Sequence, residues 1–282
     1  RWYAERQEMQ RKMNDCGDNE IEKAYWDKRQ LVKKINLNSL YGAILNPGCR
    51  FFDIRIGQSV TLTGRCITKH MGAKVNEIVA GKYDHVGESI IYGDTDSVYF
   101  SANKTLSKEI DSGQIAWNKE SVIALYDKIA DEINVSFPNF MQKAFHCPKT
   151  RGELIRAGRE LVASRGLFIT KKRYAVLYYD KEGTRVDTTG KEGKVKAMGL
   201  DLKRSDTPVF VQDFLSEILY MVLTGKDEKE VLDRITEFRK EFKARPGWEK
   251  GSPKRANNMT KYTEAEEKSG KTNMPGHVRA SM

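Results

Sequence analysis

Residues 88–101 read ESIIYGDTDSVYFS, and this stretch organises the predicted fold around it. Two apolar runs flank the polar turn Asp94-Thr95-Asp96, which predicts a β-hairpin with buried strands and the turn at its tip. Two carboxylates so close in sequence repel each other unless a cation lies near them. Carboxylates combined with substrate phosphates are the usual environment of magnesium. A simple surface Asp-x-Asp turn is the alternative, and the apolar flanks favour the metal site.

The remaining pattern mixes helices and strands without strict alternation, which indicates an α+β fold. Residues 1–14 and 19–44 read as a helical hairpin broken near Gly17, and Asn46-Pro47-Gly48 ends the second helix. The other expected elements are a strand at 50–55, helices at 57–80, 119–146, 208–224 and 227–243, strand-like runs within 152–180, and a loop-like end at 244–282.

Charge is unevenly distributed along the 282 residues, whose net charge is +10. Residues 84–135 hold 4 basic and 10 acidic groups, whereas residues 1–83 hold 15 and 9, and residues 149–210 hold 15 and 8. An acidic metal site between two basic surfaces that bind a polyanion would give this pattern. Ordinary surface variation is the alternative.

Other classes of protein find little support. The four cysteines form no C-x-x-C pair, so neither zinc nor a disulfide framework is expected, and reduced thiols in a cytoplasm fit best. No apolar run approaches the ~18 residues of a membrane span, and no signal peptide is recognisable. Because the sequence opens with Arg1 inside a helical pattern and stops without a cap, we expect a fragment of a longer gene product.

Two motifs carry a resemblance to a known family. YGDTDS resembles motif C of the B-family DNA polymerases, and KINLNSLYG at residues 34–42 resembles their motif B, K-x-x-x-N-S-x-Y-G. The segment RFFDIR at residues 50–55 is similar to one found in the polymerases of T-even-type bacteriophages. The intervening Thr95 speaks against reverse transcriptases, which carry Tyr-x-Asp-Asp.

The resemblance implies roles for the site residues. Asp96 would bind two catalytic Mg²⁺ ions directly, and Asp94 would act in the same site, more through water. Lys34, Asn38 and Tyr41 stand at i, i+4 and i+7 and so share a helical face. Lys34 would meet the triphosphate, Asn38 would hydrogen-bond to it and Tyr41 would pack against the nascent base pair. A helix with a polar stripe is the alternative.

The resemblance implies further residues that contact the incoming nucleotide or the DNA duplex. Gly42 would leave room for the base pair, and Arg6 matches an arginine that grips the triphosphate in phage-type members. A lysine expected four residues after Arg6 is replaced by Gln10, and whether the neighbouring Arg11 substitutes for it stays open. Contacts to primer–template DNA are expected from Lys171, Lys172, Arg173, Tyr174, Arg204, Asn257 and Lys261. On a strand, Lys172 and Tyr174 would share a face; a solvated basic edge strand is the alternative.

The resemblance also implies the domains: helical-hairpin fingers at 1–45, an antiparallel-sheet palm with packed helices at 46–197, and an incomplete, mainly helical thumb at 198–282. The implied function is template-directed extension of a DNA primer with dNTPs in phage replication, in the cytoplasm of an infected bacterium. Motif A is not found, so the chain alone is expected to be inactive. No exonuclease motif is found either, so proofreading is expected in a missing amino-terminal part. The missing segment and a sliding clamp are the expected partners. A non-catalytic DNA-binding fragment, or one subunit of a split polymerase, is the alternative.

Overall fold

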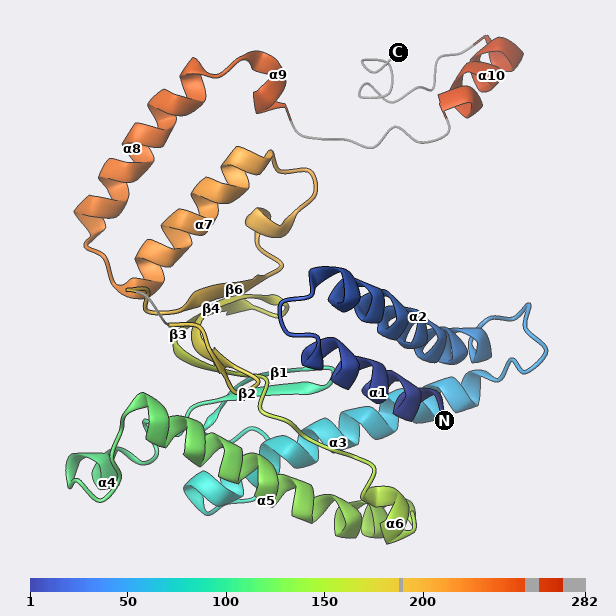
Figure 1. Cartoon of the computed structure of the whole chain (residues 1–282), viewed down its shortest axis with the longest axis vertical. Coiled ribbons are helices and arrows are strands. Elements are labelled where there is room, and N and C mark those ends of the chain that lie inside the picture. Colours follow the sequence, from blue (N-terminus) through green and yellow to red (C-terminus); the bar gives the residue numbers. More distant parts are fainter. Residues whose placement is uncertain (188–189, 252–258, 271–282) are drawn as a thin grey trace. The chain divides into compact units, whose positions relative to one another are not determined.

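The computed structural model describes residues 1–187, 190–251 and 259–270, and shows helices combined with antiparallel strands (Figure 1). The predicted α+β class is therefore confirmed. The chain divides into two compact units, Arg1–Thr105 and Leu106–Met282, which we call the first and second units and describe separately.

The first unit begins with an antiparallel helical hairpin, α1 (Trp2–Asp15) and α2 (Glu20–Ile44), as the sequence predicted. Asn19 caps α2, since its side chain accepts a hydrogen bond from the Glu22 amide at 3.2 Å. The two helices are joined by polar and ionic contacts, and none of their residues is fully buried.

The strand predicted at residues 50–55 is wrong, because this stretch is a turn that leads into helix α3 (Ile54–Ala80). Asp53 is the N-cap, and its carboxylate accepts the Arg55 amide at 2.9 Å. Arg55 also donates side-chain hydrogen bonds to this carboxylate, and together these bonds lower the pKa of Asp53 to about 2. The cap outweighs the strand preference of the two phenylalanines, of which Phe51 is 79% exposed.

The second half of α3 is the best buried part of the first unit, and the loop that follows it packs back on the helix. Asn76 is buried, donates to the Lys82 carbonyl at 2.9 Å and accepts the Ser89 amide at 3.4 Å. A side chain at Gly87 would collide with Asn76 at 1.9 Å. These contacts fix the chain as it enters the next strand.

Strands β1 (Ile90–Asp94) and β2 (Ser97–Phe100) form the predicted hairpin and pack against α3. The expectation that both strands are buried is wrong: their residues are half-buried or exposed, and Ile91 is 50% exposed. The physical reason is that, within the described ranges, these two strands form a sheet by themselves.

The second unit is built on a four-stranded antiparallel sheet. Strand β4 (Arg173–Lys181) is central and pairs with β3 (Leu161–Thr170), β5 (Thr184–Arg185) and β6 (Lys194–Met198). Before the sheet come α4 (Ser107–Asp111), α5 (Lys119–Phe145, with Pro138 inside it) and α6 (Lys149–Gly152). The long helix α5 confirms the prediction for residues 119–146.

Two helices contribute the apolar contacts that bury this sheet. Side chains of α7 (Val209–Thr224), such as Leu223, join Ala175, Leu177 and Ala197 in one cluster, and α5 contributes Val122 to a second. A short 3₁₀ helix, η1 (Asp201–Lys203), connects β6 to α7.

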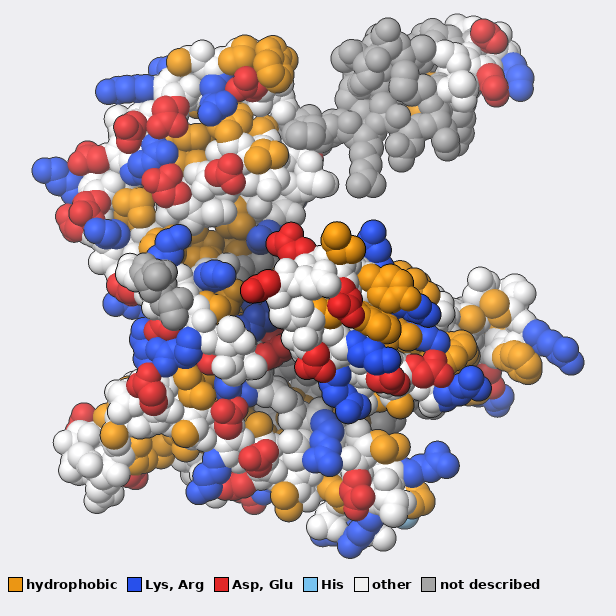
Figure 2. All heavy atoms as spheres, in the orientation of Figure 1, with side chains coloured by type: hydrophobic (Ala, Val, Ile, Leu, Met, Phe, Trp, Pro, Cys, Tyr) orange, Lys and Arg blue, Asp and Glu red, His pale blue; other side chains and the backbone are white. Residues whose placement is uncertain are grey.

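The last described elements follow α7. Helix α8 (Glu228–Ala244) packs on α7 through phenylalanines, of which Phe214 and Phe238 stack with ring centroids 3.6 Å apart. The loop-like end expected at 244–282 is wrong for α9 (Gly247–Lys250) and α10 (Met259–Ser269). Over the face shown in Figure 2, Lys and Arg side chains are interspersed with Asp and Glu.

Candidate active site

The turn between β1 and β2 is closed by hydrogen bonds among its own residues. Asp94 and Ser97 are the last paired residues, so Thr95 and Asp96 form a two-residue connection. The Asp96 amide donates to the Asp94 carbonyl at 2.6 Å, and the Ser97 hydroxyl donates to the same oxygen at 3.2 Å. The Thr95 hydroxyl donates to the Asp94 carboxylate at 3.1 Å. The Asp94 side chain is half-buried, whereas Asp96 is exposed.

Thr95 has a strained backbone, because its φ is 52° and β-branched residues rarely adopt positive φ. Such a conformation costs on the order of 1–3 kcal/mol and persists only where its surroundings impose it. Part of that constraint comes from α3, where the Thr68 hydroxyl donates to the Thr95 carbonyl at 2.8 Å. Strain of this kind concentrates at functional sites, so this turn is the leading candidate for the active site.

The chemistry of the turn suits magnesium in part. Carboxylate oxygens are the ligands that this hard cation prefers. Within the described ranges, however, no group of three or more His, Cys, Asp and Glu residues lies close enough to hold a metal. Asp94 and Asp96 therefore supply the right type of donor but too few donors for a closed site.

The residues predicted to contact the nucleotide lie along α2. Lys34 and Asn38 are exposed, whereas Tyr41 is half-buried and its hydroxyl donates to the Gly57 carbonyl at 3.4 Å. Lys33, one residue before Lys34, faces α1 instead and pairs with Glu5 at 2.5 Å. Of these two neighbouring lysines, Lys33 therefore stabilises the contact between α1 and α2, whereas Lys34 is exposed.

Arg6 lies in the contact between the two helices of the hairpin. It is half-buried, and its Nε donates to the side-chain oxygen of Gln30 at 3.2 Å. Further along α1, Gln10 is half-buried and Arg11 is exposed.

Two glycines near the end of α2 differ in what surrounds them. A side chain at Gly42 would meet no atom within 4 Å, so the packing of this chain does not require glycine there. A side chain at Gly57, by contrast, would lie 1.9 Å from Leu45 Cδ2, because α2 and α3 approach closely at that point. Open space at Gly42 is what a neighbouring ligand would need.

In the second unit, the basic segment expected to lie on a strand is instead the tip of the β3–β4 hairpin. Thr170 pairs with Arg173, so Lys171 and Lys172 form the turn, with Lys172 at φ 62°. The prediction that Lys172 and Tyr174 share a strand face is therefore wrong. Tyr174 is 8% exposed and stacks on Phe168 with centroids 5.5 Å apart.

The remaining predicted DNA contacts are Arg204, Asn257 and Lys261. Gly199 lies against the turn, since a side chain on it would come within 2.1 Å of the Lys172 carbonyl. Arg204 is exposed and forms a bidentate pair with Asp206, both bonds at 2.9 Å. Asn257 falls outside the described residues, and so does the side chain of Lys261 in α10.

Comparison with known proteins settles the family. The sequence model of DNA polymerase family B matches residues 1–142, half of the chain. The chain belongs to DNA polymerase family B. The matched range includes α1, α2, α3 and the β1–β2 hairpin, and so contains both motif B and motif C.

The DNA-directed DNA polymerase of Escherichia phage RB69 is 32% identical over 204 residues, which are 69% of this chain and 22% of that protein. That of Enterobacteria phage T4 is 29% identical over 246 residues, 83% of this chain and 26% of that protein. DNA polymerase 1 of Pyrococcus abyssi is 25% identical over 241 residues, 83% of this chain and 25% of that protein. The phage matches confirm the T-even-type resemblance, and the chain spans about a quarter of the length of each of these relatives.

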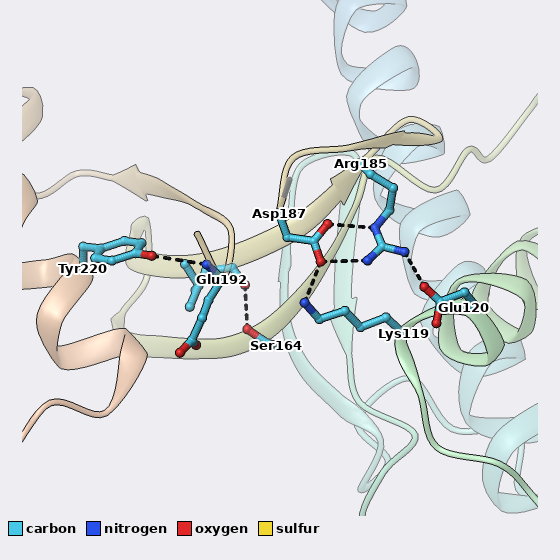
Figure 3. A network of polar contacts seen from close by, with 8 residues as sticks. Lys119, Glu120, Ser164, Arg185, Asp187, Glu192 and Tyr220 are labelled. Carbon is cyan, nitrogen blue, oxygen red and sulfur yellow. Dashed lines mark hydrogen bonds and ion pairs between the residues drawn. The ribbon is translucent and has the colours of Figure 1, made fainter. Parts of the chain in front are cut away.

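Two ionic networks of the family B chain gave no signal in the sequence. Arg159 pairs with Asp127 at 2.6 Å and with the buried Asp180, joining α5 to the sheet. Figure 3 shows the second network, in which Asp187 binds Arg185 and Lys119, while Arg185 also binds Glu120. These partners hold the pKa of the Asp187 carboxyl well below its usual range.

The two cations of the second network also lie against an aromatic ring. Lys119 and Arg185 lie 5.2 and 5.7 Å from the ring centre of Tyr179, and burial raises the pKa of that tyrosine to about 12. None of the helices in the described ranges has the length and apolar character that a membrane span requires.

Proposed function

We propose that this chain is part of a template-directed DNA polymerase that extends a DNA primer with dNTPs by two-metal-ion nucleotidyl transfer. The observation that carries the proposal is the strained Asp94-Thr95-Asp96 turn at the tip of the β1–β2 hairpin. The family B match over residues 1–142 supports it, since it spans this turn and helix α2.

In this proposal the exposed Asp96 is a direct metal ligand, and the half-buried Asp94 acts in the same site. Bound Mg²⁺ would activate the primer 3′-hydroxyl and stabilise the leaving pyrophosphate. The chain contributes a preset position of Asp94, because the Thr95 hydroxyl donates to its carboxylate and the Ser97 hydroxyl donates to its backbone carbonyl. Preorganised charges of this kind need no rearrangement during the reaction.

The α1–α2 hairpin would bind the incoming nucleotide as the fingers, residues 1–45. Lys34 and Arg6 would bind the triphosphate, and Asn38 would donate a hydrogen bond to it. Tyr41 and the open position at Gly42 would border the nascent base pair. Lys34 is exposed and positively charged, which is what a triphosphate-binding residue requires before its ligand arrives.

Duplex contacts would come from the second unit, which holds the part of the proposed palm (46–197) that follows Thr105 and the proposed thumb (198–282). Lys171, Lys172 and Arg173 are exposed at one hairpin tip, while the buried Tyr174 would act by supporting that tip. Arg204, Asn257 and Lys261 complete the proposed set. Such contacts read the phosphate backbone, so the binding should be independent of sequence and should fall steeply with salt.

The proposed partners are primer–template DNA, dNTPs, a polymerase segment that carries motif A and an exonuclease, and a sliding clamp. The proposed setting is phage DNA replication in the cytoplasm of an infected bacterium. The phage relatives support this setting.

Primer extension tests the proposal. We use "completed polymerase" for this chain joined to the segments that flank the matched region in the phage T4 polymerase. The completed polymerase should extend a primer with Mg²⁺ and dNTPs, and the chain alone should not, because Asp94 and Asp96 cannot hold two metals by themselves. Robust extension by the chain alone would contradict this account of the site, and no extension by the completed polymerase would contradict the proposed function.

The second candidate, a subunit of a split polymerase, is supported by the lack of a three-residue metal cluster among the described residues. It is tested by mixing the chain with a separate segment that carries motif A. Extension by the mixture at the rate of the covalently joined chain would favour it. A purely DNA-binding fragment would instead bind duplex in a salt-dependent way and give no extension in either format.

A further inference from the structure

A single hydroxyl group from α3 reaches the backbone of the acidic turn. Thr68 is half-buried in the middle of α3, and its Oγ1 lies 2.8 Å from the Thr95 carbonyl oxygen. The same oxygen lies 3.1 Å from the Gly64 carbonyl within its own helix. Because a hydroxyl has one proton to donate, the shorter contact competes with the ordinary bond of a helical threonine.

The Thr95 carbonyl belongs to the peptide that joins Thr95 to Asp96, so its direction determines how Asp96 is presented. In a two-residue hairpin connection, types I′ and II′ differ by a flip of this central peptide. Thr95 has positive φ and Asp96 does not, and the Asp96 amide of this peptide donates back to the Asp94 carbonyl at 2.6 Å. A flip would place Asp96 at positive φ and would turn its carboxylate to another direction.

We infer that Thr68 is a positioning residue that locks the Thr95–Asp96 peptide and thereby aims the Asp96 carboxylate. The inference rests on the proposed function of Asp96 and adds a residue that lies in neither motif B nor motif C. Asp94 is already held by the hydroxyl groups of the turn itself, whereas the hydrogen bond from Thr68 connects the turn to a second element.

The chain offers a matched control on the same helix. Thr61 is exposed on α3, and its hydroxyl donates within the helix, to the Gln58 carbonyl at 2.9 Å and the Gly57 carbonyl at 3.3 Å. Thr68→Val and Thr61→Val remove the same group from the same kind of backbone. Thr68→Ser keeps the hydroxyl donor and should therefore behave like the wild type.

The first measurement uses the 282-residue chain and needs no metal: amide hydrogen exchange resolved at Asp96, whose N–H bonds to the Asp94 carbonyl. Thr68→Val should accelerate exchange about threefold to tenfold, the effect of losing one neutral hydrogen bond. Thr61→Val and Thr68→Ser should match the wild type. If valine at position 68 unfolds the chain, Thr68→Ala against Thr68→Ser makes the same comparison, since both lack the methyl group. Equal exchange with and without the hydroxyl overturns the inference.

The second measurement uses the completed polymerase. Thr68→Val should raise the Mg²⁺ concentration needed for half-maximal incorporation by about threefold to tenfold, with unchanged affinity for primer–template. The same requirement as Thr61→Val would overturn the inference. Failure of the wild-type completed polymerase to extend would count against the proposed function alone, because the exchange result on the chain does not depend on activity.

Discussion

The two β-hairpins of this chain have similar turns and very different supports. Each has a two-residue connection that contains one residue at positive φ, Thr95 at 52° and Lys172 at 62°. The acidic hairpin is a two-stranded sheet packed on α3, with no fully buried residue. The basic hairpin lies in a four-stranded sheet, and its β4 strand is mostly buried.

The difference indicates where stability and function reside. A two-stranded hairpin is marginal without further packing, so the acidic turn depends on local hydrogen bonds and on α3. The basic turn is held by a core that would exist without any ligand. We therefore expect core substitutions in the second unit to lower stability strongly, and substitutions at the candidate site of the first unit to affect activity with little effect on stability.

The largest effect should come from Leu177→Ala in β4. Leu177 is fully buried against α7, so its truncation should lower the free energy of unfolding by about 2–5 kcal/mol. Ile91→Ala in β1 is the matched change, and its half-exposed side chain should make it much milder. Urea unfolding of both variants measures this contrast. Equal decreases in the free energy of unfolding would contradict the proposed difference between the two hairpins.

Next in size is the effect of Lys34→Ala on the completed polymerase. Removing a charge that stabilises the transition state should lower the single-turnover incorporation rate by roughly 10²–10³. Primer–template affinity should be nearly unchanged, because this lysine faces the nucleotide in our proposal. Lys33→Ala is the control, since Lys33 pairs with Glu5 inside the helical hairpin and should leave the rate within a few-fold. A Lys34 variant that loses duplex binding but incorporates normally would place α2 on the DNA.

His70 should make the first unit sensitive to acid. It is 6% exposed with its Nδ1 2.8 Å from the Tyr83 hydroxyl, and burial, followed by nearby Lys74, lowers its pKa to about 4. The unfolded chain, with a histidine pKa of about 6.5, therefore binds a proton at His70 at a higher pH than the folded chain does.

The contribution of neutral His70 to the free energy of unfolding should be fully present above about pH 6.5. The free energy of unfolding should fall by up to about 3 kcal/mol as the pH drops to about 4. His70→Gln should abolish this part of the pH dependence in urea unfolding curves. His85→Gln, at a histidine whose side chain is 44% exposed, should not change it. A His70 variant with the wild-type pH profile would show that His70 is not its source.

The smallest effect on stability should come from Gly42→Ala. Its surroundings are open, and alanine is the better helix former, so the chain should gain up to about 1 kcal/mol. In the completed polymerase the same methyl group should lower incorporation, because it would occupy the space proposed for the base pair. Gly57→Ala should instead destabilise the chain through its clash with Leu45. Normal incorporation by Gly42→Ala would sink the role assigned to that glycine.

Much of the fold could be predicted, because local patterns specify it. The helical hairpin and the turn at Asp94–Asp96 follow from periodicity and turn residues, and both were found. The errors arose where one residue outweighed a pattern: Asp53 starts a helix after two strand-forming phenylalanines, and the Lys171–Lys172 pair turns the chain within a run of strand formers.

Less of the candidate site could be predicted, because its supports are distant in sequence. Thr68 and Thr95 are 27 residues apart, so no local pattern joins them. The roles of Lys34 and Asp96 came from a resemblance, and they stay predictions.

The most direct test of this account is the Asp96→Asn variant of the completed polymerase, measured for single-turnover incorporation and for thermal unfolding. Asparagine keeps the size of the side chain and removes the charge at an exposed position, so the melting temperature should stay within about a degree of the wild type. Incorporation should fall by at least about 10², the scale for losing one preorganised electrostatic group. Incorporation at the wild-type rate would contradict the assignment of the β1–β2 turn as the catalytic centre.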